Sequence, residues 1–142
     1  MKIYKCPHCG NTAVLLDEKG PKLHCCGEEM QLLEAGVTDG AVEKHVPFVK
    51  RKEGGKVKIR VGEVDHPMTT EHHISWILLE TQLGFQFAKL SADGKPKAKF
   101  KMRKKDTPIA AYEYCNLHGL WKRDIDDSIV IEPKEDKEKK AD

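Results

Sequence analysis

The stretch EYCNLHGLW, residues 113–121, decides how this chain folds and what it can bind. It begins at the end of an apolar run, residues 109–114, which predicts a β-strand. Cys115 and His118 lie three residues apart, so a thiolate and an imidazole can reach one ion from a loop. The stretch therefore predicts a strand that ends in a metal site.

Two other segments can complete this site. EKHVP, residues 43–47, supplies His45, and HPMTTEH, residues 66–72, supplies His66 and His72. Prolines near His45 and His66 predict rigid turns there. With Cys115 and His118 the set has five ligands, whereas a closed tetrahedral zinc site takes four. Five protein ligands on a metal that prefers six leave one position open for chemistry.

Three alternatives stay open at this set. His73 follows His72, and in a strand the two side chains would face opposite ways, so only one of them can bind. Cys115 could instead be a nucleophile with His118 as its base, although no carboxylate orienter is evident in the sequence. Glu43 and Lys44, which precede His45, are either a solvated charge pair or groups at the mouth of the open position.

The first 36 residues predict a second metal site, of four thiolates. Both cysteine pairs, Cys6 with Cys9 and Cys25 with Cys26, are followed by glycine. A segment below about 40 residues rarely folds without a metal or disulfides, so four thiolates would act as its staple. Zinc and iron both accept this ligand set, and the adjacent histidines, His8 and His24, are expected to be structural or exposed.

The rest of the chain has the pattern of strands separated by turns. Val57, Ile59 and Val61 alternate with polar residues, as in a half-buried strand. The predicted strands are residues 12–16, 57–61, 74–79, 85–90, 98–102, 109–114 and 128–131. Short strands at this spacing, with no sustained helical periodicity, predict an all-β chain with a β-sandwich.

We therefore expect three parts along the chain. Residues 1–36 would form the small metal-stapled domain, and residues 37–131 the β-sandwich that carries the histidine set. Residues 132–142 form a charged tail of low complexity that is expected to be disordered. Residues 37–42, which contain glycine and aspartate, are expected to link the two domains.

Composition limits the partners and the compartment. The net charge of +2 does not favour nucleic acid or a membrane surface as a partner, and the excess of cations lies in residues 37–130. No signal peptide and no apolar stretch of membrane-spanning length are evident, so a cytoplasmic protein is expected. In a reducing compartment, five cysteines are more often ligands than disulfides.

With these motifs in hand, the chain resembles the desulfoferrodoxins, which are two-iron superoxide reductases. The CxxC and CCG pairs at Cys6 and Cys25 are similar to the desulforedoxin-type centre. The segments EKHVP, HPMTTEH and YCNLHG match three motifs of the catalytic domain in order and spacing. The resemblance covers Tyr4 to about Trp121, although the family usually has an aromatic residue where His73 stands.

The resemblance implies a desulforedoxin-like domain followed by an immunoglobulin-like β-sandwich. It implies two iron ions per chain: one is tetrahedral with four cysteines, and the other has four equatorial histidines, with His72 rather than His73 among them, and axial Cys115. The implied activity is one-electron reduction of superoxide to hydrogen peroxide, with Glu43 capping the oxidised site and Lys44 at its mouth. The implied partners are a rubredoxin-like electron donor and a second copy of the chain in a homodimer.

Two rival functions would use only part of these residues. A zinc-ribbon module that binds nucleic acid would need a basic stripe with aromatic residues in the first 36 positions, which hold four lysines against five acids. A plain electron-transfer protein that uses only the four-cysteine centre would leave the histidine set unexplained. Iron at two ions per chain would favour the reductase.

Overall fold

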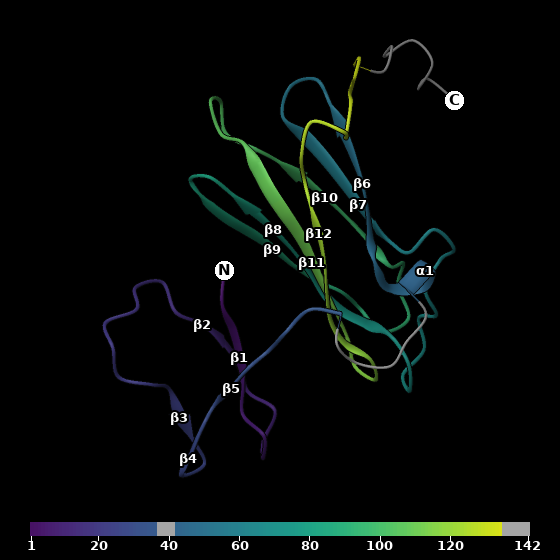
Figure 1. Cartoon of the computed structure of the whole chain (residues 1–142). Helices are drawn as coiled ribbons and strands as arrows, with labels where there is room; N and C mark the ends of the chain where they lie inside the picture. Colours follow the sequence, from purple (N-terminus) through teal and green to yellow (C-terminus); the bar gives the residue numbers. More distant parts are fainter. Residues whose placement is uncertain (37–41, 135–142) are drawn as a thin grey trace. The chain divides into compact units, whose positions relative to one another are not determined.

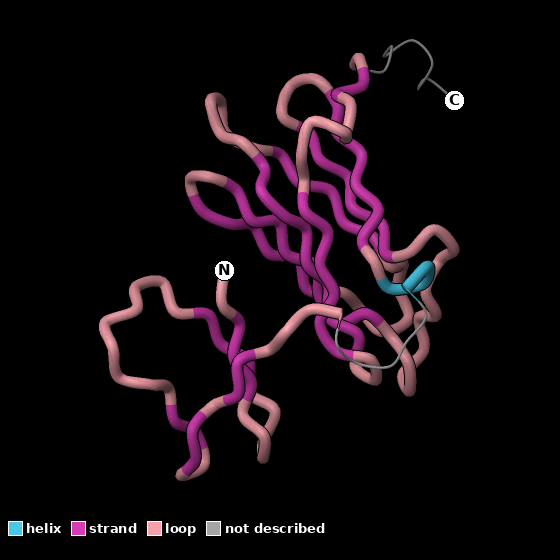
Figure 2. The backbone as a smooth tube through the Cα atoms, in the orientation of Figure 1, coloured by secondary structure: helices cyan, strands magenta, loops and turns pink. Residues whose placement is uncertain are grey.

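The computed structural model describes residues 1–36 and 42–134, apart from the side chain of Glu43. The chain divides into two compact units, Met1–Ala35 and Gly36–Asp142 (Figure 1). Strands dominate the described residues, and their one helix has a single turn (Figure 2). The prediction of an all-β chain is thus confirmed. Within the described ranges, no helix has the length and apolar character needed to span a bilayer.

The first unit has little regular structure and a very small core. Strand β1 (Ile3–Lys5) pairs with β2 (Thr12–Val14) and with β5 (Gln31–Leu32), and β3 (His24–Cys25) pairs with β4 (Glu28–Glu29). Its buried hydrophobic side chains are Ile3, Cys6 and Met30. So few apolar groups cannot offset the conformational entropy of ordering the unit, which agrees with the expected need for a metal staple.

The second unit is a β-sandwich of two four-stranded sheets. One sheet has the order β10-β7-β6-β13 and the other has the order β12-β11-β8-β9. A helical turn, α1 (Val42–His45), precedes the first strand. The strands are β6 (Pro47–Lys52), β7 (Lys56–Val61), β8 (Ile74–Thr81), β9 (Gly84–Lys89), β10 (Lys97–Lys101), β11 (Pro108–Cys115), β12 (Gly119–Asp124) and β13 (Ile131–Glu132).

The core lies between these two sheets and follows the alternation of side chains along each strand. In β7, the valines and the isoleucine point inward, while Lys56, Lys58 and Arg60 point to the other face. The buried cluster draws on both sheets and consists of Val49, Val57, Ile59, Val61, Ile74, Ile77, Leu79, Phe100, Met102, Ala111, Cys115 and Ile125. Cys115 is therefore anchored in the packed interior as well as in the metal-binding loop.

Several strand predictions need correction. β6 and β12 were not predicted, because the outward positions of both carry charged residues that interrupt the apolar pattern. The strand expected at residues 128–131 is wrong in its bounds: the Asp126 carboxylate accepts hydrogen bonds from the amide and hydroxyl of Ser128, which forms a turn there. Pairing with β6 begins only at Ile131 and includes Glu132, which we had assigned to the tail.

Some expected features fall outside the described residues. Of the predicted linker, residues 37–41 lie outside the described part of the chain, and Val42 begins α1. Most of the predicted tail, residues 135–142, lies there as well.

A close backbone contact fixes α1 against the end of β7. Gly62 has φ of +81°, and a Cβ atom at this position would lie 2.7 Å from the carbonyl oxygens of both Lys44 and Val64. The Gly62 amide also donates a hydrogen bond to the Val46 carbonyl oxygen, at 3.1 Å. Glycine is thus required here by both conformation and space, and the contact holds the segment that contains His45.

We expect Gly62→Ala to destabilise the second unit and to displace His45. The matched control is Gly36→Ala, because Gly36 has φ of +74° but a Cβ there would meet only Trp121, at 3.9 Å. The control should lose about 1–2 kcal/mol of unfolding free energy, the cost of the left-handed conformation. Gly62→Ala should lose clearly more and should also bind less metal. Chemical denaturation and metal content measure both effects, and equal losses would contradict the close-contact interpretation.

Candidate metal centres

Four histidines of the second unit stand edge to face in a ring. In the order His45, His66, His72 and His118, neighbouring imidazole centroids lie 4.5 to 5.0 Å apart, with interplanar angles of 71° to 83°. The rings of His45 and His72 lie across from each other, with centroids 6.5 Å apart. This is the arrangement of four imidazoles around one central point.

The ring nitrogens have the spacing of ligands on one ion. Nε2 of His45 lies 3.2 Å from Nε2 of His66 and 3.0 Å from Nδ1 of His118. Two nitrogens bound at right angles, each about 2.1 Å from a metal, are about 3.0 Å apart. Nε2 of His72 is buried and has no hydrogen-bond partner among the described residues, a cost that a bound cation would remove. The residues present therefore fit a metal ion.

Cys115 supplies a fifth donor, on one side of the ring. Its Sγ lies 3.5 Å from Nε2 of His66 and 3.7 Å from Nδ1 of His118, and these two histidines are diagonal members of the ring. A sulfur close to both diagonal members lies out of the plane of the nitrogens. All five donor atoms lie within 4.8 Å of one another. The set has the form of a square pyramid with sulfur at its apex.

Strand pairing positions the sulfur. Cys115, the last residue of β11, pairs with Gly119, the first residue of β12, across a three-residue loop, and Gly119 has φ of +78°. On the other side of β11, the register passes from Tyr114 opposite Trp76 to Cys115 opposite Ile74. The skipped residue of β8 forms a bulge, a common device beside functional sites, and it leaves Cys115 facing the interior.

A tight turn separates the roles of the adjacent histidines. The His72 amide donates to Oγ1 of Thr69 at 3.1 Å, and the Thr69 amide donates to the His72 carbonyl oxygen at 2.9 Å. Nδ1 of His73 donates to the Thr69 carbonyl oxygen at 2.9 Å. The His72 ring belongs to the cluster, whereas the His73 ring is turned toward the backbone of its own loop.

Two residues that the sequence analysis did not single out hold the loops together. The amide group of Asn116 accepts from the His73 backbone N–H at 2.8 Å and donates to the Glu71 carbonyl oxygen at 2.9 Å. The Trp121 indole stacks on His45, with centroids 5.0 Å apart, and its N–H donates to the His118 carbonyl oxygen. Both lie within the stretch 113–121, but no ligand chemistry distinguishes them in a sequence.

Burial favours the neutral, metal-binding form of two of the imidazoles, those of His66 and His72. Desolvation lowers the pKa of His66 to about 4, and it lowers the pKa of His72 as well. Nδ1 of His66 donates to the Pro67 carbonyl oxygen at 2.7 Å, which leaves the lone pair on Nε2. Burial also raises the pKa of the Cys115 thiol, although the backbone N–H groups of His118 and Leu117 oppose this shift. A cation is thus needed to hold Cys115 as a thiolate.

A buried carboxyl group lies in β11 two residues before Cys115. Glu113 is 0% exposed, and neither carboxyl oxygen has a hydrogen-bond partner among the described residues. Desolvation raises the pKa of Glu113 to about 9, so the group is protonated at neutral pH. This neighbour of Cys115 in β11 is therefore a neutral acid and adds no negative charge to the thiolate.

The four cysteines of the first unit also converge. Their sulfur atoms lie within 4.8 Å of one another, and Sγ of Cys9 is 3.6 Å from Sγ of Cys25. Two sulfurs of a tetrahedral site with bonds of about 2.3 Å stand about 3.8 Å apart, so the spacing fits one ion. Cys26 has φ of +54°, an uncommon conformation for a non-glycine residue, at the position where two adjacent cysteines contribute to one cluster.

The thiols of this unit differ in how readily they ionise. The Cys9 backbone N–H, together with weaker contacts, lowers the pKa of Cys6 to about 6, whereas hydrogen bonding with Cys9 and Cys6 raises the pKa of Cys26 to about 12. Four ionised sulfurs at this spacing require a cation among them. His8 pairs with the Glu28 carboxylate and His24 bonds the Lys22 carbonyl oxygen, so both histidines engage other groups.

The two residues expected at the mouth of the histidine site lie in α1. Lys44 is exposed. Desolvation is the main cause of the lowered pKa of His72, and the positive charge of Lys44 lowers this pKa further. Lys44 is therefore close enough to act on the cluster. The side chain of Glu43 lies outside the described part of the chain.

Two family models match the chain and together cover most of it. The model described as desulfoferrodoxin matches residues 37–124, and the model described as desulfoferrodoxin, N-terminal domain, matches residues 1–33. The desulfoferrodoxin of Nitratidesulfovibrio vulgaris is 46% identical over 85% of this chain and 94% of the relative. That of Clostridium acetobutylicum is 43% identical over 88% of this chain and 97% of the relative.

Solved structures give the same assignment. The superoxide reductase from Treponema pallidum matches with a TM-score of 0.71 and 36% identity, over 87% of this chain and 99% of that chain. The one-iron superoxide reductase from Giardia intestinalis matches with a TM-score of 0.51 and 35% identity, over 59% of this chain and 98% of that chain. Since both units are matched and both donor sets are present, the chain belongs to the desulfoferrodoxin family.

Proposed function

We propose that this protein is a superoxide reductase with two iron centres. The observation that supports this function is the square pyramid of four imidazoles and one cysteine sulfur, which has no sixth donor among the described residues. The superoxide reductases of Treponema pallidum and Giardia intestinalis share the fold. The reaction adds one electron and two protons to superoxide and yields hydrogen peroxide.

The ligands of the reactive iron would be His45, His66, His72, His118 and Cys115. Iron held by this set supplies a one-electron reductant with one coordination position left for a small anion. The protein contributes four imidazoles, a sulfur held in a packed interior, and hydrogen bonds that fix the His66 tautomer and the His118 loop. These contacts preorganise the donor set, so that little rearrangement is needed when the substrate arrives.

The second iron would be held by Cys6, Cys9, Cys25 and Cys26. Four sulfur ligands close the tetrahedron, which leaves no position for substrate. In a unit with so small a core, this ion would hold the fold together and could also carry electrons.

The surroundings of the reaction are also part of the proposal. Lys44 attracts superoxide to the open side, and Glu43 caps that side when the iron is oxidised. A rubredoxin-like protein returns the electron used in each turnover. We further propose that the protein works in the cytoplasm. We also propose that it is a homodimer, as the family resemblance implies.

Replacement of the apical sulfur tests the function most directly. Cys115→Ser should abolish superoxide reduction and leave the four-cysteine centre and the sandwich intact, because Cys115 is the one cysteine outside the first 36 residues. Superoxide consumption and peroxide yield, measured with the reduced iron-loaded protein, provide the test. Near-normal turnover in the variant would refute the assignment of Cys115.

The adjacent histidines provide an internal control for the ligand set. His72→Ala should lose iron from the histidine centre, whereas His73→Ala should retain most of it, because the His73 ring bonds to the Thr69 carbonyl oxygen. Iron per chain, measured for both variants, is the readout. The reverse result would exchange the roles of the two residues.

Lys44→Ala should slow the second-order reaction with superoxide and weaken its dependence on salt. An ammonium acts on an approaching anion over about 8 Å at physiological ionic strength, so only a charge near the open side has this effect. Lys104→Ala, which removes an exposed loop lysine, is the control. Pulse radiolysis at several salt concentrations measures both rates. Equal rates at low salt would show that Lys44 has no steering role, and a changed iron spectrum would indicate a structural one.

A further inference from the structure

One face of the sheet that contains β6, β7 and β10 is lined almost entirely by cations. The strand register aligns outward side chains in three rows across the three strands. The rows are Phe48, Arg60 and Lys97; Lys50, Lys58 and Lys99; and Lys52, Lys56 and Lys101. Eight of these nine positions are lysine or arginine. We call this surface the basic face.

The basic face concentrates charge that the chain as a whole does not have. The net charge of the protein is only +2, yet eight cations lie on one face of three short neighbouring strands. Two carboxylates adjoin its far end: Glu53 follows β6, and Glu132 pairs with Lys52. Like charges directly opposite each other destabilise a sheet, so a negatively charged surface laid on this face would relieve the repulsion.

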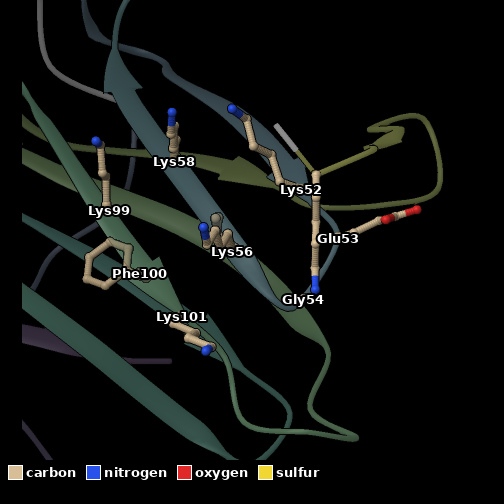
Figure 3. A pocket seen from close by; sticks show the side chains of 10 residues that line it. Lys52, Glu53, Gly54, Lys56, Lys58, Lys99, Phe100 and Lys101 are labelled. Atoms are coloured by element: carbon tan, nitrogen blue, oxygen red, sulfur yellow. The ribbon is translucent and has the colours of Figure 1, made fainter. Parts of the chain in front are cut away.

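The surface is open and hollowed. A cavity of about 520 Å³ is lined by Lys52, Glu53, Gly54, Lys56, Val57, Lys58, Lys99, Phe100, Lys101 and Lys134. In Figure 3 the side chains of Lys52, Lys58 and Lys99 extend from the same side of the sheet. A second hollow, of about 260 Å³, lies over the row that contains Phe48. Negative side chains of a partner could thus enter between the lysines.

The basic face begins beside the histidine centre. Phe48 is three residues after His45, so their Cα atoms are at most about 11 Å apart. In the same row, Arg60 lies over the Phe48 ring, with its guanidinium carbon 5.0 Å from the centroid. A partner seated on the row of Phe48, Arg60 and Lys97 would therefore lie close to the first ligand of the reactive iron.

We infer that the basic face is the docking surface for the electron donor, a small one-electron carrier protein with an acidic surface. The inference rests on the proposed function, because only a centre that is oxidised in each turnover needs a donor. In the step concerned, the reduced donor passes one electron to the oxidised histidine centre, and no proton or bond is exchanged. Electrostatic attraction would speed the encounter and still allow the used donor to leave.

The side-chain chemistry favours an acidic protein over a nucleic acid. Seven of the eight cations are lysines, which are hydrated point charges rather than the planar forks that suit phosphate. The one arginine of the face is already stacked on Phe48. Phe100 is only 8% exposed, so its ring is not available for stacking with bases.

The test compares two triple variants of the full, iron-loaded chain. The face variant removes three exposed cations of the basic face by the substitutions Lys50→Gln, Lys97→Gln and Lys99→Gln. The control, with Lys89→Gln, Lys104→Gln and Lys105→Gln, removes three exposed cations of the same unit and gives the same net charge. An acidic rubredoxin serves as the probe, and both its affinity and its rate of reducing the oxidised centre are measured at several ionic strengths.

We expect the face variant to bind the rubredoxin about 10-fold more weakly at low ionic strength, with a similar loss in reduction rate and a shallower salt dependence. The control should stay within about 2-fold of the parent. Equal effects of the two variants, or none, would overturn the docking surface. Tighter binding of a DNA duplex than of rubredoxin by the parent, lost in the face variant, would also overturn it in favour of nucleic acid.

A separate measurement distinguishes failure of this inference from failure of the proposed function. The reduced parent and both variants are mixed with superoxide, and its consumption is followed directly. If all three proteins consume superoxide, but the face variant binds rubredoxin and is reduced by it as the parent is, the reductase assignment stands and the docking surface is wrong. If the parent does not consume superoxide, the proposed function is wrong, and the inference about an electron donor fails with it.

Discussion

The constraint on which the second unit depends is the crowding of five lone-pair donors, three of them on buried residues, at one end of a β-sandwich. Their donor atoms lie within 4.8 Å of one another, and Nε2 of His72 has no hydrogen-bond partner in the described chain. Such a cluster destabilises the folded chain when no cation is bound, and it stabilises the fold when a cation binds. The bulge in β8, the close packing of Gly62 against Lys44 and the Asn116 bridge each hold one part of it. Much of the irregular structure at this end therefore serves to position donor atoms.

Local chemistry explains what could be predicted from the sequence. Metal-binding side chains are distinctive in type and spacing, so all nine expected donors could be named, and the structure gathers them into two groups. Inward positions of β7 and β8 are apolar, so these strands were evident. β6 and β12 were missed because their outward charges mask the apolar positions. The bridging role of Asn116 depends on a partner 43 residues away, which no local pattern reveals.

The two units use different sources of stability. In the second unit, both sheets contribute to one apolar core, and the metal centre lies at its edge. In the first unit, the buried hydrophobic side chains are only Ile3, Met30 and the cluster member Cys6, so the ion would take the place of a core. The two donor sets also differ in whether they can react with a substrate. An open set of five donors can accept a substrate, whereas a closed set of four cannot.

The separation of the ligands along the chain also sets an order of assembly during synthesis. The four cysteines lie within the first 26 residues, so their site can close soon after this segment leaves the ribosome. His45 and His118 are 73 residues apart, and the reactive site is complete only after β11 and β12 have paired. Closing so long a loop is slow compared with local folding. Uptake of the reactive iron would therefore come late, so a partly made chain would not expose an iron that has an open coordination position.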